Sequence, residues 1–214
     1  MITESVNTNP EASMLLREAA EWRLIGLLFE CPDGQWLQEV AALASEVDDA
    51  ELKTAAGAAR DQATAGRYHS AFGPGGPAAP REVSYRDTIL PGHLISELQA
   101  FYNVFGYAPP GDEPPDHVCV QANFVGYLRL KQAYAVLRND VDQAEVTAEA
   151  VRQFCENHLS AMAEPLANAL AWSDLSYLAS TAAALLRRVG PRPQAGDEQG
   201  LPVLEHADGT LECG

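Results

Sequence analysis

Apolar residues recur at the spacing of an α-helix through most of this 214-residue chain. The first segment ends before Pro32 and carries two apolar stripes, Leu16, Ala20, Leu24 and Leu27 on one and Leu15, Trp22, Ile25 and Phe29 on the other. A helix with two apolar faces is expected at the centre of a bundle. Because no pair of segments shows the alternation of paired strands, the sequence predicts an all-α, single-domain helical bundle.

Further helices are expected wherever this spacing returns. Their ends are predicted from glycine, proline and capping residues. Gly66 is expected to end an Ala-rich helix that starts at Glu51, and Asp174 to cap the last helix of the chain. Pro165 is expected to bend or break the helix that contains it.

The helix predicted over Val118 to Leu137 carries a broad apolar arc. Its members are Val120, Phe124, Tyr127, Leu128, Tyr134 and Leu137. An arc of this kind is more often core than ligand site, so we expect it to be buried. Lys131 interrupts the arc, and its stem is expected to pack there while its ammonium reaches solvent.

A long Gly/Pro-rich loop, from Phe72 to Pro91, interrupts the helical pattern and begins FGPGGPAAP. Long loops inside compact domains are usually functional or disordered, so we expect this one on the working surface. Residues 191–214 have little apolar content and no period, which predicts a flexible acidic tail. The expected organisation is an all-helical domain over residues 1–190, followed by that tail.

The charge balance limits the partners. Thirty acidic and fourteen basic residues give a formal charge of −16, which repels nucleic acids and anionic membranes and attracts basic partners. No apolar run approaches the roughly 20 residues that cross a bilayer. The N-terminal segment lacks the basic and apolar regions of a secretory signal. We expect a cytoplasmic protein without a nucleic-acid partner and without stable membrane insertion.

The four cysteines, Cys31, Cys119, Cys155 and Cys213, lack the spacing of paired metal ligands. Three of them lie within or at the edge of apolar helical patterns, so buried, reduced thiols are expected rather than a disulfide framework. His158 lies on another apolar stripe and is expected in the core, packed or hydrogen-bonded.

The densest group of chemically active residues, Glu113, Pro114, Pro115, Asp116 and His117, stands where the long helix begins. An acid beside an imidazole can serve acid–base catalysis. Adjacent helical residues point about 100° apart, however, so a catalytic dyad is not expected. Asp116 is expected either to cap the helix or to join a recognition edge, and His117 either to pack or to bind there.

Other chemistry is weakly supported. His117 and Gln121 are four residues apart and close to Cys119, but glutamine is a poor metal ligand and no second histidine or acid completes a set. His206 and Cys213 add little to this. The glycines of the FGPGGPAAP loop are not followed by the Lys-Ser or Lys-Thr of a phosphate loop. We therefore expect no catalytic residue, metal or cofactor.

Taken together, two segments resemble the TorD/DmsD/NarJ family of molybdoenzyme maturation chaperones. Glu113 to His117, followed by Val118 to Leu128, resembles the family's E-x-P-D-H-like turn and the helix after it. Residues 71–74, followed by Pro80 and residues 82–85, resemble its second feature, a Pro-containing loop with an E-S-V-Y-like string. The order of Val83 and Ser84 is inverted here. The stretch FVGYLRLKQAYA is most similar to the branch that serves type II dimethyl sulfoxide reductase family enzymes.

The resemblance, which runs from about Ala19 to Leu186, implies a non-enzymatic, all-helical chaperone. Such a protein binds the twin-arginine signal peptide and the catalytic subunit of a molybdoenzyme, assists cofactor insertion and delays export. The residues implied in client binding are Glu113, Pro114, Pro115, Asp116, His117, Gln121, Glu82, Ser84 and Tyr85. Gln121 and Asn123 depart from the family pattern, because glutamates commonly follow the Asp-His pair there.

Two other readings stay open at the level of sequence. One is a small helical metal-dependent enzyme or sensor that uses His117 and Cys119, with His206 and Cys213 from the tail. The other is a regulatory adaptor that binds a basic helix and serves no molybdoenzyme.

Overall fold

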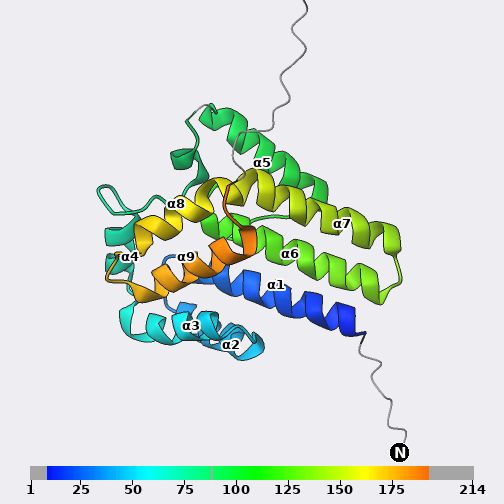
Figure 1. Cartoon of the computed structure of the whole chain (residues 1–214), viewed down its shortest axis with the longest axis horizontal. Coiled ribbons are helices and arrows are strands. Elements are labelled where there is room, and N and C mark those ends of the chain that lie inside the picture. The colour runs from blue at the N-terminus through cyan, green and yellow to red at the C-terminus, as the bar shows by residue number, and fades with distance from the viewer. Residues whose placement is uncertain (1–8, 88, 193–214) are drawn as a thin grey trace, which may run out of the picture.

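The computed structural model describes residues 9–87 and 89–192, and their regular structure is helical (Figure 1). The elements are α1 (Pro10–Leu28), α2 (Trp36–Glu46), α3 (Ala50–Gln62), α4 (Ala65–Phe72), a 3-10 turn η1 (Glu82–Tyr85), α5 (Pro91–Phe105), α6 (Val118–Leu137), α7 (Val141–Phe154), a π turn η2 (Cys155–Leu159), α8 (Ser160–Leu170) and α9 (Ser176–Val189). In these residues extended pairing is limited to one isolated bridge, between Arg81 and His117. The all-α prediction is confirmed.

The antiparallel pair α1 and α6 forms the centre, as the two apolar stripes of α1 predicted (Figure 1). Two glycines allow α1 and α6 to approach each other closely. A Cβ added at Gly126 would lie 3.1 Å from the carbonyl oxygen of Ala19, and one added at Gly26 would lie 2.1 Å from Oδ1 of Asn123. Larger side chains at these positions would push the helices apart.

The remaining helices enclose this pair. α7, η2 and α8 run on from one another without a break and pack against α6 and α9, while α9 also packs against α3 (Figure 1). π turns bend helices and often occur at functional sites. This one brings His158, which is 1% exposed, against the Phe101 and Phe154 rings.

Two predicted helix ends were wrong. Gly66 lies inside α4, because the preceding helix already ends at Gln62. Asp174 does not cap α9, whose N-cap is Leu175 without a side-chain hydrogen bond. Pro165 lies within α8 and does not break it.

The predicted burial of the α6 arc is correct for its first half only. Tyr134 is 63% exposed and Leu137 is 50% exposed, because no helix covers the C-terminal part of this face in the part of the chain described. Leu16, from one stripe of α1, is 43% exposed. The Lys131 ammonium donates a 2.9 Å hydrogen bond to the carbonyl of Phe105, at the end of α5.

Within the described residues Cys31, Cys119 and Cys155 are free thiols, but only Cys119 is buried, whereas Cys31 and Cys155 are half-buried. None of the helices described is long and apolar enough to cross a membrane. Most of the predicted tail, including His206 and Cys213, lies outside the described residues.

Candidate functional site

Asp116 ties the Gly/Pro-rich loop to the start of α6. Its fully buried carboxylate accepts hydrogen bonds from Nε of Arg81 at 2.9 Å and from the Val83 N–H at 3.3 Å. The backbones are joined as well, since the Glu82 N–H donates to the Asp116 carbonyl and the Val118 N–H to the Pro80 carbonyl. Asp116 is therefore not the helix cap, because its carboxylate serves partners 33 to 35 residues away in sequence.

The N-cap of α6 is His117 and not Asp116. Its Nδ1 accepts a hydrogen bond from the Cys119 N–H at 3.2 Å, and its Nε2 lies 3.3 Å from the Tyr68 hydroxyl. Burial lowers the pKa of His117 to about 4, and the nearby Arg81 charge acts in the same direction. The imidazole is neutral at physiological pH, and Glu113, 3.9 Å from Nε2, faces an uncharged ring.

Glu82 is the centre of a second buried group. Its carboxylate accepts hydrogen bonds from Arg86 at 2.6 Å and Gln121 at 2.5 Å, and lies 3.3 Å from Nδ1 of His158. Burial alone would raise the pKa of Glu82, but His158 and Arg86 outweigh it and hold the pKa below its usual value. Arg86 also contacts the Asn157 carbonyl of η2. The predicted core hydrogen bond of His158 is therefore confirmed.

This group gives a physical reason for one departure from the family pattern. Gln121 donates its amide N–H directly to the Glu82 carboxylate in a fully buried position. A glutamate at position 121 would place a second negative charge against the first, away from water. The neutral amide is the side chain that suits a buried, ionised Glu82.

The predicted client-binding residues divide by exposure. Glu82, Asp116, His117 and Gln121 are buried, whereas Glu113 and Ser84 are exposed and Pro114, Pro115 and Tyr85 are half-buried. We call the buried contacts of Glu82, Asp116, His117 and Gln121 the junction. The loop was expected wholly on the surface, but its Glu82 is 0% exposed, because η1 turns that side chain inward.

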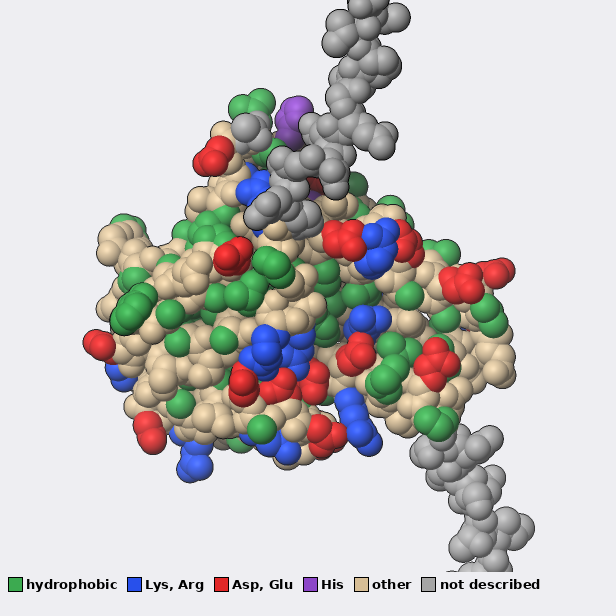
Figure 2. Space-filling model, in the orientation of Figure 1, with side chains coloured by type: hydrophobic (Ala, Val, Ile, Leu, Met, Phe, Trp, Pro, Cys, Tyr) green, Lys and Arg blue, Asp and Glu red, His purple; other side chains and the backbone are tan. Residues whose placement is uncertain are grey.

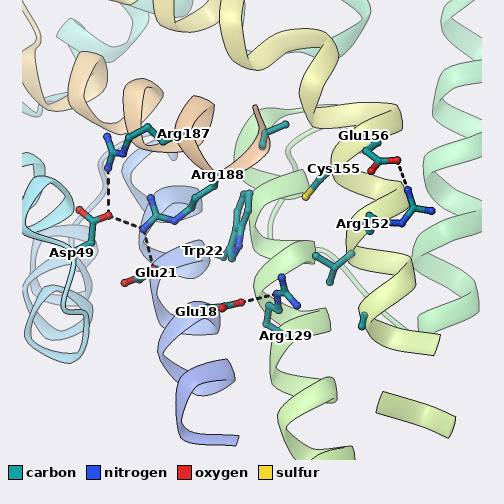
Figure 3. A pocket seen from close by; sticks show the side chains of 13 residues that line it. Glu18, Glu21, Trp22, Asp49, Arg129, Arg152, Cys155, Glu156, Arg187 and Arg188 are labelled. Atoms are coloured by element: carbon teal, nitrogen blue, oxygen red, sulfur yellow. Dashed lines mark hydrogen bonds and ion pairs between the residues drawn. The ribbon is translucent and has the colours of Figure 1, made fainter. Parts of the chain in front are cut away.

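A cleft of about 640 Å³ opens between α1, α6, α7 and α9 (Figure 3). Most of the residues that line this cleft are charged, and Trp22 and Cys155 lie among them. Acidic and basic side chains also lie next to one another on the face of the molecule shown in Figure 2. Burial raises the pKa of the Cys155 thiol to about 12, so this sulfur is protonated and a poor nucleophile.

The charges around the cleft neutralise one another. Arg188 of α9 lies 2.9 Å from Glu21 and 2.8 Å from Asp49, the residue that caps α3 (Figure 3). Arg129 of α6 lies 2.9 Å from Glu18 of α1. A charged ligand would have to displace these partners, so we interpret the pairs as contacts that hold the helices together.

A second hollow, the α1–α6 groove, has a different character. It measures about 410 Å³ and is lined by apolar residues of α1, α6 and the loop before α6. They include Leu16, Ala20, Tyr107, Pro110, Tyr127 and Leu130. Sequence reasoning missed this groove, because its residues carry the same helical spacing as core residues.

Within residues 9–87 and 89–192, no three His, Cys, Asp or Glu side chains are grouped so that they could hold a metal ion.

Comparison with known proteins places this bundle in a chaperone family. The family model of the nitrate reductase delta subunit matches residues 40–168, more than half of the chain. The chain therefore belongs to this family, which comprises NarJ/TorD-type chaperones of redox enzymes, and the predicted family is confirmed. The family is one of maturation proteins and not of catalysts.

A solved structure supports the fold. It is the crystal structure of a candidate redox enzyme maturation protein from Archaeoglobus fulgidus. The two chains are 19% identical, with a TM-score of 0.53 over 80% of this chain and 93% of the other. At that identity the likeness concerns the fold alone. No curated protein sequence gave a significant match.

Proposed function

We propose that this protein is a cytoplasmic maturation chaperone for a molybdoenzyme. It binds the twin-arginine signal peptide and the catalytic subunit, assists insertion of the molybdenum cofactor and delays export until insertion is complete. Family membership supports the general role. The observation that carries signal-peptide binding is an exposed acidic edge, Asp112 and Glu113, that buried contacts hold in place.

Those contacts surround the edge on its C-terminal side. The Tyr102 hydroxyl donates to the carbonyl of Pro115 at 2.7 Å, and the His117 N–H donates to that of Pro114 at 2.9 Å. Proline fixes its own backbone angle, so two prolines in succession limit the conformations of the segment further. A fixed acidic edge can pair with a guanidinium without a large loss of conformational entropy.

The predicted site residues then act in two ways. Glu113 contacts the arginines of the peptide directly, with Ser84 and the half-buried Pro114, Pro115 and Tyr85 at the same surface. The junction residues Glu82, Asp116, His117 and Gln121 hold that surface in position. Their side chains are buried and do not contact the peptide. The formal charge of −16 adds a long-range attraction for a basic peptide.

Titration calorimetry with a synthetic twin-arginine peptide from the partner enzyme tests this proposal. Replacing the edge by Asp112→Asn and Glu113→Gln should weaken binding about tenfold at low salt. A matched control, Asp142→Asn with Glu145→Gln, removes two exposed charges from α7 and should change affinity little. Absence of binding to both the peptide and the full-length catalytic subunit would rule out the function.

A further inference from the structure

A hollow between α2 and α3, which we call the α2–α3 pocket, combines apolar walls with basic side chains. It measures about 320 Å³. Its apolar lining includes Val40, Ala41, Ala44, Ala56 and Leu37, the last of which is 42% exposed. Lys53 and Arg60 of α3 also line it, and no acidic residue of the described chain does. The pocket is therefore a basic and apolar site on a protein with a formal charge of −16.

The two cations of the pocket have no carboxylate partner within residues 9–87 and 89–192. The residues at helical spacing from Arg60 are Ala56, Gly57, Ala63 and Thr64, and none of them is acidic. Lys53 follows Asp49 by four residues, but that carboxylate caps α3 and lies 2.8 Å from Arg188. Because Lys53 and Arg60 are both exposed, they are available to carboxylates that come from outside the pocket.

The described chain ends close to this pocket. Arg187 and Arg188, in the last turn of α9, contact Glu51 and Asp49 at the start of α3, and the two helices lie side by side (Figure 1). Gly190, with φ of +81°, ends α9, and the described residues end two positions later. Residues 193–214 therefore begin near the N-terminal end of α3, which is the end of the pocket where Lys53 lies.

The sequence of residues 193–214, which lie outside the described residues, is complementary to the pocket. It contains no Lys or Arg, and its acidic residues are Asp197, Glu198, Glu205, Asp208 and Glu212. The apolar side chains Leu201, Val203 and Leu204 stand between the first two of these acids and the last three. An apolar stretch with carboxylates on both sides matches an apolar pocket that has two cations along its length.

We propose that residues 198–205 of this chain bind in its own α2–α3 pocket. Glu198 pairs with Lys53 and Glu205 with Arg60, so the segment runs parallel to α3. The seven residues between the two glutamates span at most about 25 Å, and the long stems of both cations extend their reach along the pocket. The apolar stretch covers Leu37 and the alanines of the lining, which removes apolar surface from water.

The covalent link favours this occupant over a second copy or another protein. Leu201 follows Val189 by twelve residues, which extend up to about 40 Å, whereas α3 is about 20 Å long. A segment on a linker of this length has an effective concentration on the order of millimolar. Two exposed ion pairs and a few apolar contacts hold separate molecules together poorly, but they are sufficient at that concentration. The inference goes beyond the proposed function and does not depend on it.

Photo-crosslinking in the full-length protein tests the site and the direction. A benzophenone side chain introduced at Gln199 should crosslink to the part of α3 around Lys53, and one at His206 to the part around Arg60. Both crosslinks should form within one chain, with a yield that does not change on dilution. Crosslinks to other elements, or the reverse order along α3, would overturn the inference. Crosslinks between chains would also overturn it, because they would assign the pocket to a second copy.

Charge reversal provides the matched control. Lys53→Glu with Arg60→Glu should lower the crosslink yield about tenfold, because both ion pairs become repulsive. Arg138→Glu with Arg152→Glu changes the net charge equally at exposed positions outside the pocket and should leave the yield unchanged.

Reversal on the other side of the contact should have the same effect. Glu198→Lys with Glu205→Lys should lower the yield about tenfold, and combining this pair with Lys53→Glu and Arg60→Glu should restore it. An equal loss in the control variant, or no recovery in the combined variant, would show that the ion pairs do not form.

Discussion

The junction and the α1–α6 groove reverse the usual distribution of polar and apolar residues. The junction buries two carboxylates, an imidazole and an amide, with Glu82 and Asp116 at 0% exposure. The groove exposes leucine and tyrosine side chains of the two central helices. At the junction each carboxylate has several hydrogen-bond partners, whereas the apolar groove is not covered by any described segment.

The difference teaches which part of the molecule serves structure and which is available to a partner. A buried charge that is fully paired has little left to offer a ligand, and its removal destabilises the fold. An exposed apolar side chain adds little to stability and is available for burial in a complex. Substitutions at the junction should therefore lower stability, and substitutions in the groove should leave it nearly unchanged.

The largest effect is expected at Glu82. Glu82→Ala should lower the free energy of unfolding by about 3–5 kcal/mol, because it leaves Arg86 and Gln121 without their buried partner. Urea unfolding measures the change, and Glu82→Gln provides a milder variant should the alanine variant not fold. The same measurement on Glu156→Ala, which breaks a surface ion pair with Arg152, should show less than about 1 kcal/mol. Equal losses at the two positions would contradict the assignment of the junction.

The pH dependence of stability should show the titration of His117. Its pKa is about 4 in the folded protein and 6.5 in the unfolded chain, so the unfolded chain binds more protons between these values. Stability should therefore fall as the pH is lowered from 6.5 to 4, by up to roughly 3 kcal/mol from this group. His117→Asn keeps an N-cap side chain and should remove this part of the dependence. Superimposable stability–pH curves for wild type and variant would show that His117 is not the group responsible.

A smaller loss is expected where the two central helices meet beside Arg23 and Asn123, which line the groove. Gly26→Ala should cost about 1–3 kcal/mol, because the new Cβ meets Asn123, which Arg23 and Glu30 hold in place. Gly57→Ala on α3 is the matched control: nothing lies within 4 Å of its added Cβ, so stability should rise by about 0.5–1 kcal/mol. Thermal unfolding of both variants decides whether close packing, and not glycine itself, is responsible.

The smallest effect on stability is expected in the groove, at Leu130, and next to it on α6, at Tyr134. Leu130→Ser and Tyr134→Ser should each change the free energy of unfolding by less than about 0.5 kcal/mol, since both side chains already contact water. Chemical denaturation of each single variant measures this change in the free energy of unfolding. A loss above about 2 kcal/mol would mean that these side chains serve the fold, and the contrast with the junction would disappear.

Much of the fold could be predicted from the sequence, because helical periodicity is a local property. The central position of α1 followed from its two apolar stripes, and the core position of His158 from the stripe on which it lies. The residues that cap the helices were harder to predict. Asp116 is a good capping residue in isolation, but Arg81, 35 residues earlier, provides a stronger partner for its carboxylate.

The candidate site was predicted only in part. The sequence identified the segment Glu113 to His117, but exposure divides its members: the glutamate lies at the surface and Asp116 and His117 lie below it. The groove was missed because Tyr127, which lines it, lies at helical spacing from buried Phe124. Spacing predicts which residues share a face of a helix, and does not indicate whether another helix covers that face.

By itself, then, the sequence determined the helical class, the central helix and the two motifs that indicate a maturation chaperone. Each of these depends on residues close together in the chain. Only the tertiary structure decided that the acid–imidazole pair lies inside the junction and that an apolar strip of α6 remains outside. The physical reason is that burial and hydrogen-bond partners depend on contacts between distant segments, such as Asp116 with Arg81 or Gly126 with Ala19.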